Sequence, residues 1–152
     1  MSAQNLDVFL KFLFLQPGGA FRCPQRFPSD PKPKNRYFFI LNRDPERDEE
    51  IVLVTPTTQG QRRREARGKA GEASIVDLSP QEYSALEVPS TVDCNSAEVW
   101  TKAELGRRIA AREASILDPL PETMLKRLRE AVLCSRLIEP RIKRLVLGED
   151  VF

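Results

Sequence analysis

The sequence predicts a mainly β protein with C-terminal helices, an α+β fold in which a small antiparallel barrel or sheet carries helices on one side or end. Strand-like apolar runs fill the chain before residue 100, and helical patterns follow them. Long helices do not alternate with these strands, which argues against a parallel, doubly wound sheet. With 152 residues, of which 41% are apolar, the chain can bury one ordinary core. We therefore expect a single domain over 1–152, with a small barrel core over 17–100 and a helical part over 101–152.

The chain begins with an apolar run over residues 6–15, which Asp7 and Lys11 interrupt. A membrane span needs about 20 apolar residues, and a secretory signal needs a basic leader, whereas residues 1–5 carry no basic side chain. We therefore expect this run to be a helix or strand packed on the core, with no membrane association.

A turn at Pro17-Gly18-Gly19 precedes a short strand that we predict over residues 20–23. Four prolines then argue against any regular element, and the stretch ends in three cations. The prolines are Pro24, Pro28, Pro31 and Pro33, and the cations are Lys32, Lys34 and Arg36. We predict a loop here, which is either a solvated connector or a binding loop that holds cations near the next strand.

Two continuous apolar runs, residues 37–41 and 51–55, have strand length and strand composition, so we predict that they are neighbouring core strands. Arg36 opens the first run, and Pro56-Thr57-Thr58-Gln59 follows the second. Pairing of the two strands would bring Arg36 near one end of a sheet and Thr57 near a strand terminus. An arginine and a hydroxyl at such a place are suited to holding a phosphate, which suggests a nucleic acid partner.

Residues 61–69 have the sequence QRRREARGK and offer almost nothing to bury, so we predict a mobile basic loop over 61–71. Strand character resumes over 74–78 and again over 90–95. Between them, Ser79-Pro80-Gln81-Glu82 combines a capping serine, a proline at the first helical position and a glutamate three residues after the serine. This pattern predicts a short helix.

Three further helices are predicted in the last part of the chain. Thr101-Lys102-Ala103-Glu104 repeats the capping-box pattern and starts a helix that extends to about Glu113. A second helix starts at Pro121, and Pro140 starts a third over residues 141–147, which Gly148 can end. The apolar residues at helical spacing in the second helix are Met124, Leu125, Leu128 and Val132.

Composition argues against several kinds of site. The chain has no histidine, and its three cysteines, Cys23, Cys94 and Cys134, lie far apart, so we expect no metal site and no cofactor. A sparse and odd set of cysteines fits a reducing compartment, the cytoplasm. The sequence also lacks a glycine-rich phosphate loop and a Ser-His-Asp set. We expect Cys94 to be a small core residue rather than a nucleophile.

The formal net charge of +2 conceals a strongly basic patch in the predicted loop. Its five cations lie close to one acid, Glu65, and could neutralise several phosphates, which would give salt-sensitive binding to nucleic acid. They are Arg62, Arg63, Arg64, Arg67 and Lys69. Ordinary solvated surface and a docking place for an acidic protein are the alternatives.

Without histidine, catalysis has to use Arg, Lys, carboxylate, hydroxyl or thiol groups. RNA scission by internal attack is one suitable reaction, because the substrate's own 2′-hydroxyl is the nucleophile and the protein needs only to move protons and stabilise a charged phosphorane. Arg36 could stabilise that phosphorane, and Thr57 and Thr58 could bind phosphate oxygens. Asp93 could accept a proton. The alternatives are a surface cation, turn-forming threonines and a turn-capping aspartate.

The order of these short motifs resembles the MazF/PemK family of toxin endoribonucleases from toxin–antitoxin pairs. The resemblance covers about residues 17–137. Its motifs are the arginine-led strand 35–41, the strand 51–59 that ends in Thr-Thr-Gln, the strand 75–78, the segment 90–95 and a closing helix. The resemblance implies an SH3-like or CcdB-like small barrel, a homodimer, metal-independent cleavage of single-stranded RNA, and inhibition by a small antitoxin protein.

Two positions carry the family's active-site residues over to this sequence. Arg36 matches the catalytic arginine, and Thr57 matches the active-site threonine. Three other places depart from the family pattern. Tyr37 replaces the usual proline, Pro17-Gly18-Gly19 stands where a Gly-Asp pair usually starts the first strand, and Asn95 occupies the place of a family aspartate. A carboxylate role at this place would fall to neighbouring Asp93.

The resulting hypothesis is a toxin-like endoribonuclease with Arg36, Thr57 and Asp93 as catalytic residues. Its expected RNA-binding residues are Thr58, Gln59, Arg62, Arg63, Arg64, Arg67 and Lys69. The alternative is a catalytically inactive module of the same barrel type that binds a protein or RNA target. A structural protein that uses residues 121–148 as a partner face is a third possibility.

Overall fold

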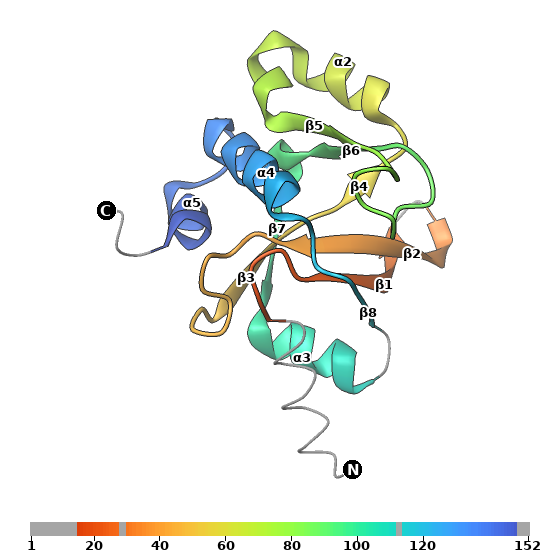
Figure 1. The fold of residues 1–152 in the computed structure, drawn as a ribbon, viewed down its shortest axis with the longest axis vertical. Helices are drawn as coiled ribbons and strands as arrows, with labels where there is room; N and C mark the ends of the chain where they lie inside the picture. Colours follow the sequence, from red (N-terminus) through yellow and green to blue (C-terminus); the bar gives the residue numbers. More distant parts are fainter. Residues whose placement is uncertain (1–14, 28–29, 112–113, 149–152) are drawn as a thin grey trace.

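The computed structural model describes residues 15–27, 30–111 and 114–148, and this part of the chain forms two antiparallel sheets with helices packed on them (Figure 1). The five-stranded sheet has the order β7-β3-β2-β1-β8, and the three-stranded sheet has the order β4-β6-β5. The predicted fold class, antiparallel strands with C-terminal helices, is confirmed. Apart from Leu15, the apolar run predicted over 6–15 lies outside the described residues.

The strands are β1 (Ala20–Phe27), β2 (Asp30–Ile40), β3 (Glu50–Val54), β4 (Pro56–Thr57), β5 (Ile75–Leu78), β6 (Ser90–Asp93), β7 (Glu98–Thr101) and β8 (Ser115–Leu117). The α-helices are α2 (Gly60–Gly71), α3 (Lys102–Ala110), α4 (Glu122–Cys134) and α5 (Pro140–Leu147). Two short 3₁₀ helices are η1 (Glu72–Ser74) and η2 (Cys94–Ser96). Figure 1 shows α2 and α3 at opposite ends of the molecule, with the sheets between them.

The two apolar runs predicted as neighbouring core strands do pair. β2 and β3 are antiparallel, with Phe39 opposite Val54 and Ile40 opposite Leu53. Successive side chains of a strand point to opposite faces of the sheet. A continuous apolar run therefore gives each strand two buried faces, and each face needs a core of its own.

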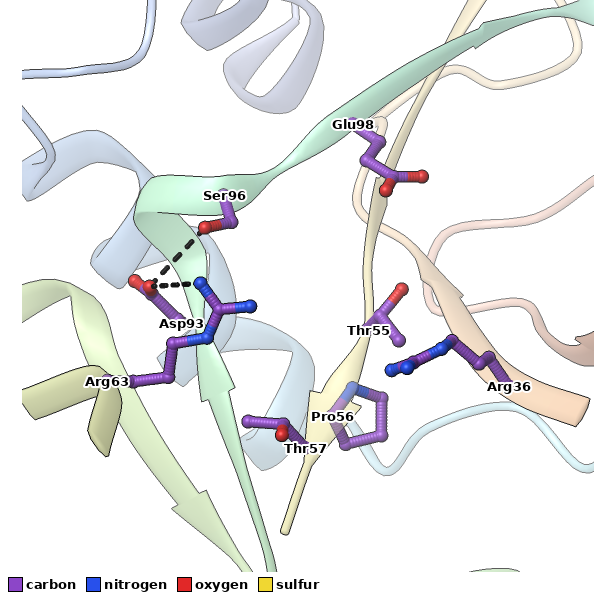
Figure 2. A pocket seen from close by; sticks show the side chains of 8 residues that line it. All are labelled: Arg36, Thr55, Pro56, Thr57, Arg63, Asp93, Ser96 and Glu98. Atoms are coloured by element: carbon purple, nitrogen blue, oxygen red, sulfur yellow. Dashed lines mark hydrogen bonds and ion pairs between the residues drawn. The ribbon is translucent and has the colours of Figure 1, made fainter. Parts of the chain in front are cut away.

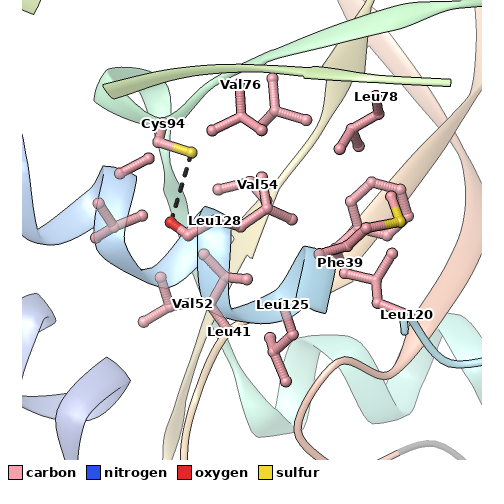
Figure 3. Packing of buried hydrophobic residues seen from close by; sticks show 14 of the residues in the cluster. Phe39, Leu41, Val52, Val54, Val76, Leu78, Cys94, Leu120, Leu125 and Leu128 are labelled. Carbon is pink, nitrogen blue, oxygen red and sulfur yellow. Dashed lines mark hydrogen bonds between the residues drawn. The ribbon is translucent and has the colours of Figure 1, made fainter. Parts of the chain in front are cut away.

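Two apolar cores cover these two faces. One contains Phe21 and Phe38 and is closed by Leu105 of α3. The other contains Phe39 and is closed by α4 and the three-stranded sheet (Figure 3). The α4 residues in this second core include the four that helical spacing predicted, namely Met124, Leu125, Leu128 and Val132. Burial of these side chains fixes α4 and the three-stranded sheet against the five-stranded one.

The loop predicted from the prolines is wrong, because Pro24 lies in β1 and Pro31 and Pro33 lie in β2. The two strands form a hairpin whose outer half extends past its neighbours, since β8 pairs with β1 only over 20–22 and β3 pairs with β2 only over 39–40. In a two-stranded ribbon the outward edges have no third strand to bond. Prolines that lack an N–H are tolerated there.

The mobile basic loop predicted over 61–71 is also wrong, because these residues belong to α2. Arg, Gln, Glu, Ala and Lys are good helix formers, but this helix has no apolar stripe to reveal it in the sequence. It is attached through polar contacts instead, with Arg64 Nη2 2.9 Å from Asp77 Oδ2 and Arg67 Nε 3.0 Å from Asp93 Oδ2. Gly68, with φ of 65°, interrupts the helical backbone near its end.

Ser79 makes the predicted capping contacts, but the short helix does not form. The Ser79 hydroxyl accepts from the Glu82 N–H at 3.3 Å, and the Tyr83 N–H donates to the Ser79 carbonyl at 3.1 Å. The chain then leaves the helical path, because Tyr83 is buried against Phe39 and its hydroxyl donates to the Asp118 carbonyl. One turn remains of the predicted helix.

The three C-terminal helices are confirmed as α3, α4 and α5. The Thr101 hydroxyl accepts from the Glu104 N–H at 3.1 Å, as the capping box predicts, and Gly148 follows α5 with φ of 95°. The strand predicted over 90–95 ends at Asp93, where η2 begins. Strands β4, β7 and β8 were not predicted.

Two short segments carry the chain from one sheet to the other. Thr55 alone separates β3 of the larger sheet from β4 of the smaller one, and η2 links β6 of the smaller sheet to β7 of the larger. Because β7 pairs with β3, with Leu53 opposite Glu98, both crossings lie side by side. Polar side chains of the two crossings therefore gather at one place. No helix in the described part of the chain has the length and apolar character to cross a membrane.

Candidate active site

A small pocket of about 80 Å³ lies at the two crossings between the sheets (Figure 2). Its lining comes from β2, α2, the two crossings and the strands β4, β6 and β7 that the crossings join. The lining residues are Arg36, Thr55, Pro56, Thr57, Arg63, Asp93, Ser96 and Glu98. The pocket thus brings together Arg36, Thr57 and Asp93, the three residues that the sequence predicted as catalytic, although they lie far apart in the chain.

Two arginines approach the pocket from opposite sides. Arg36 lies in β2 beyond the residues that pair with β3, and Arg63 lies in the first turn of α2. Figure 2 shows Arg36 on one side of the pocket and Arg63 on the other, with the Arg63 guanidinium beside Asp93 and Thr57 below the two arginines. The Arg63 side chain remains 49% exposed. Two guanidinium groups and a hydroxyl that line one pocket form a place where an anion the size of a phosphate can bind.

Asp93 differs from the other lining residues because its side chain is only 3% exposed and is surrounded by donors. Oδ1 accepts from the backbone N–H of Asn95 at 3.1 Å and from its Nδ2 at 2.9 Å. Oδ2 accepts from Arg67 Nε at 3.0 Å and from the Ser96 hydroxyl at 3.3 Å, and lies 3.9 Å from Arg63 Nη1. A buried carboxylate with its oxygens so occupied holds two arginines in place.

Asn95 uses its amide as both a donor and an acceptor. Besides its contact with Asp93, Nδ2 lies 3.3 Å from the Gly71 carbonyl, and Oδ1 accepts from the Ser135 hydroxyl at 2.7 Å. These contacts connect η2 to the ends of α2 and α4. A carboxylate here could not donate and would face the Asp93 carboxylate, so the amide fits this position.

Thr57 combines the predicted turn chemistry with a place in the pocket. Its Oγ1 accepts from the Gln59 N–H at 3.1 Å, and the hydroxyl proton remains to donate to a bound oxygen. Thr58 and Gln59, predicted to bind RNA, are exposed but do not line the pocket.

The five basic residues predicted to bind RNA divide into three groups. Arg63 lines the pocket. Arg64 and Arg67 are engaged in the ion pairs that attach α2 to the strands. Arg62 and Lys69 lie exposed on the helix, outside the pocket.

Sequence reasoning missed Thr55, Ser96 and Glu98. Thr55 and Ser96 lie in the two crossings, and Glu98 begins β7, a strand that was not predicted. The Glu98 carboxylate accepts a hydrogen bond from Trp100 Nε1, with 3.3 Å between Oε2 and the nitrogen. Alternation along the segment Glu-Val-Trp-Thr puts Glu98 and Trp100 on one face, and this is the signal that could have revealed the pair.

The described thiols contribute nothing to the pocket. Cys94 is buried in the core, as predicted, and its Sγ lies 3.8 Å from the Leu128 carbonyl (Figure 3). Burial raises the pKa of this thiol well above its usual range, and the Asp93 carboxylate adds to the rise. In the described residues no group of three or more His, Cys, Asp or Glu side chains could hold a metal ion.

Comparisons with known proteins give likenesses among solved structures only. No protein-family model and no curated protein matches the chain. Among solved structures, the chain is similar to one described as an endoribonuclease in complex with its cognate antitoxin from a mycobacterial species. The sequence identity is 14% and the TM-score is 0.49, and the likeness covers 82% of this chain and 98% of that one. A likeness this low carries no argument about the activity of this chain.

Proposed function

We propose that the protein is an endoribonuclease that cleaves single-stranded RNA by attack of the 2′-hydroxyl on the adjacent phosphodiester. The observation that carries the proposal is that two arginines, Arg36 and Arg63, line one pocket together with Thr57. Such an arrangement is suited to a group whose negative charge grows as the reaction proceeds.

The reaction asks little chemistry of the protein, which fits a site without histidine. As the 2′-oxygen bonds to phosphorus, the two non-bridging oxygens gain negative charge, which the guanidinium groups of Arg36 and Arg63 stabilise. The Thr57 hydroxyl donates to one of these oxygens and fixes the phosphate. The P–O5′ bond then breaks, which leaves a 2′,3′-cyclic phosphate and a 5′-hydroxyl. The arginines supply the positive charge that the reaction requires, so no metal ion is part of this mechanism.

Asp93 contributes to this proposal by positioning rather than by taking a proton. Its oxygens accept from Arg67, Ser96 and Asn95, and its side chain is almost fully buried. A 2′-hydroxyl would have to displace these donors to reach it. By holding Arg67, and through it α2, Asp93 keeps Arg63 at the edge of the pocket.

The exposed cations of α2 extend the binding surface outside the pocket. Arg62 and Lys69 are free of the ion pairs that hold Arg64 and Arg67 to the strands, so they can contact phosphates of neighbouring nucleotides. Binding would then weaken as salt is raised. The resemblance further implies a homodimer and an inhibitory antitoxin protein, and we include both in the proposal.

A direct test compares wild type with Arg36→Ala and Arg62→Ala on mixed-sequence single-stranded RNA in the presence of a chelator. Removal of Arg36 is expected to slow cleavage by about 100-fold or more, as the loss of one transition-state donor does in other enzymes. Arg62→Ala removes an equal charge outside the pocket and is expected to keep the rate within about threefold when RNA is saturating. Equal rates for wild type and Arg36→Ala would remove Arg36 from the site.

The second candidate is an RNA- or protein-binding module without activity. The observation in its favour is the position of Asp93, whose oxygens are already occupied. Salt-sensitive RNA binding by the wild-type protein without any cleavage product would support this module. Absence of RNA affinity would point to a protein target.

A further inference from the structure

Thr55 contributes to the pocket a hydroxyl that makes no hydrogen bond to any described residue. We propose that this hydroxyl binds the 2′-hydroxyl of the nucleotide on the 5′ side of the cleaved bond, an inference that rests on the proposed function. The 2′-hydroxyl is the group by which a protein distinguishes RNA from DNA at a given site. Thr55 is then the residue through which the pocket selects ribose.

The position of Thr55 is fixed by the residues on either side of it. Thr55 is the single residue between β3 and β4, where the chain passes from the larger sheet to the smaller one. Before it, Val54 lies opposite Phe39 in the larger sheet. After it, Pro56 lies opposite Val92 in the smaller sheet. Because these pairings hold the crossing in place, the Thr55 hydroxyl is not needed to join the two sheets.

Thr55 lies next to the groups that hold the phosphate in the proposed function. Residues two apart in an extended chain point to the same side, which agrees with Thr55 and Thr57 both lining the pocket. Figure 2 shows Thr55 on the same side of the pocket as Arg36. In RNA the 2′-hydroxyl and the 3′-phosphate are attached to adjacent carbons of the ribose. A group that binds the hydroxyl therefore has to lie beside the groups that bind the phosphate, and Thr55 does so.

The other charged and polar groups around the pocket are engaged or lack the right chemistry. Guanidinium groups donate hydrogen bonds but do not accept them, so the arginines cannot accept from a 2′-hydroxyl. Both oxygens of Asp93 already accept hydrogen bonds. The Ser96 hydroxyl accepts from Arg67 Nη2 at 2.8 Å and donates to Asp93 Oδ2. Glu98 accepts from Trp100 and makes a further interaction.

The two threonine hydroxyls of the pocket have different capacities. Thr57 Oγ1 accepts from the Gln59 N–H, and its proton donates to the phosphate in the proposed function. The Thr55 oxygen can accept from the 2′-hydroxyl, and this contact orients the 2′-oxygen toward phosphorus. A 2′-deoxy nucleotide offers no partner at this place. Because the Thr55 side chain is only half-buried, water can replace the contact, so the preference for ribose is several-fold rather than absolute.

The test compares two nucleotides that bind without being cleaved, a ribonucleoside 3′-monophosphate and the matching 2′-deoxyribonucleoside 3′-monophosphate, each with all four bases. The two members of a pair differ only in the 2′-hydroxyl. Calorimetry should show that the wild type binds the ribonucleotide about threefold to tenfold more tightly, which corresponds to one hydrogen bond. Equal affinity for the two nucleotides, or binding of neither at millimolar concentration, would overturn the inference.

Thr55→Val removes the hydroxyl and keeps the branched shape of the side chain. This variant should bind the two nucleotides equally, with about the affinity that the wild type has for the deoxyribonucleotide. A merely structural role of Thr55 would weaken both and leave their ratio unchanged, which would contradict the proposal. Thr58→Val is the control, because Thr58 is exposed and does not line the pocket, and it should keep the wild-type ratio.

Two further variants keep the inference testable if Thr55→Val does not fold. Thr55→Ala should lose the preference for ribose, and Thr55→Ser, which retains a hydroxyl, should keep it. The same ratio in both variants would overturn the inference. An RNA cleavage assay separates it from the proposed function. Cleavage by a wild-type protein that binds both nucleotides equally rejects only the role of Thr55. Intact RNA, together with a ribose preference that Thr55→Ala abolishes, rejects only the proposed cleavage.

Discussion

At the scale of single residues, the most informative position is Asp93. Both of its carboxylate oxygens already accept hydrogen bonds from other residues, which fits a structural role better than proton transfer. The carboxylate joins η2 to α2 through Arg67 and Ser96. The sequence placed Asp93 near the site but could not reveal these contacts, because they depend on an arginine 26 residues earlier in the chain.

Asp93→Asn should destabilise the protein more than the comparable change at Asp77. Removal of the Asp93 charge leaves Arg67, whose side chain is 25% exposed, without its buried partner, at a cost of about 2 kcal/mol in the free energy of unfolding. Asp77, which is 65% exposed and pairs with Arg64, should cost about 1 kcal/mol or less when changed to Asn. Urea denaturation of the two variants measures the difference. A loss from Asp77→Asn as large as that from Asp93→Asn would contradict this account of the buried pair.

Asn95→Asp should destabilise the protein because it replaces an amide that both donates and accepts. The new carboxylate would lie where Nδ2 now donates to Asp93 at 2.9 Å, and it would also lose the bond to the Gly71 carbonyl. We expect a loss of about 2 kcal/mol near neutral pH. The loss should shrink at acidic pH, where one of the two carboxyl groups can hold a proton. Exposed Asn35→Asp is the control, and thermal melting at two pH values makes the comparison.

Native alkylation should distinguish the cysteines. Burial raises the pKa of the Cys94 thiol, so at pH 8 almost none of it is thiolate, and the side chain is enclosed in the core. Cys134 is exposed. Iodoacetamide followed by mass spectrometry should therefore label Cys134 in the native protein and Cys94 only after unfolding. Rapid native labelling of Cys94 would mean that the core around α4 opens readily.

At the scale of elements, the sequence predicted what is locally encoded. The strands β2 and β3 and the helix α4 bury continuous or periodic apolar residues, and their patterns are visible without knowledge of the partner. Helix α2 has no such pattern, since its attachment depends on ion pairs with β5 and β6. The prolines of β1 and β2 led to the wrong prediction of a loop. A strand can contain them because β8 and β3 do not extend along the outer half of the hairpin, and the sequence does not show where those neighbouring strands end.

The close contact between α2 and β6 gives a prediction for Gly60, and Gly106 in α3 is the control. A Cβ on Gly60 would lie 2.3 Å from the Thr91 Oγ1, so Gly60→Ala should push the start of α2 away from β6. A Cβ on Gly106 in α3 would meet nothing within 4 Å. Gly60→Ala is expected to lower the free energy of unfolding by about 1 to 3 kcal/mol, and Gly106→Ala to raise it by up to about 1 kcal/mol. Urea denaturation of both variants tests the contact, and a stabilising Gly60→Ala would contradict it.

At the scale of the whole molecule, the candidate site exists because two crossings between the sheets lie side by side. The sequence indicated Arg36, Thr57 and Asp93 through local motifs and a family resemblance, and the structure brings all three to one pocket. Glu98 could not be predicted in the same way, because its place depends on the pairing of β7 with β3. Sequence patterns therefore do not reveal site residues whose position depends on the pairing of strands that are far apart in the chain.

The central claim is cleavage of RNA by its own 2′-hydroxyl at this pocket. The most direct measurement maps the cut in a short single-stranded RNA and then repeats the reaction with a single 2′-deoxy nucleotide on the 5′ side of that bond. The account predicts 2′,3′-cyclic phosphate ends on the all-RNA substrate and complete protection of the modified bond, with binding unchanged. Continued cleavage at the modified bond would show that a different nucleophile attacks, and it would contradict the mechanism proposed for Arg36, Arg63 and Thr57.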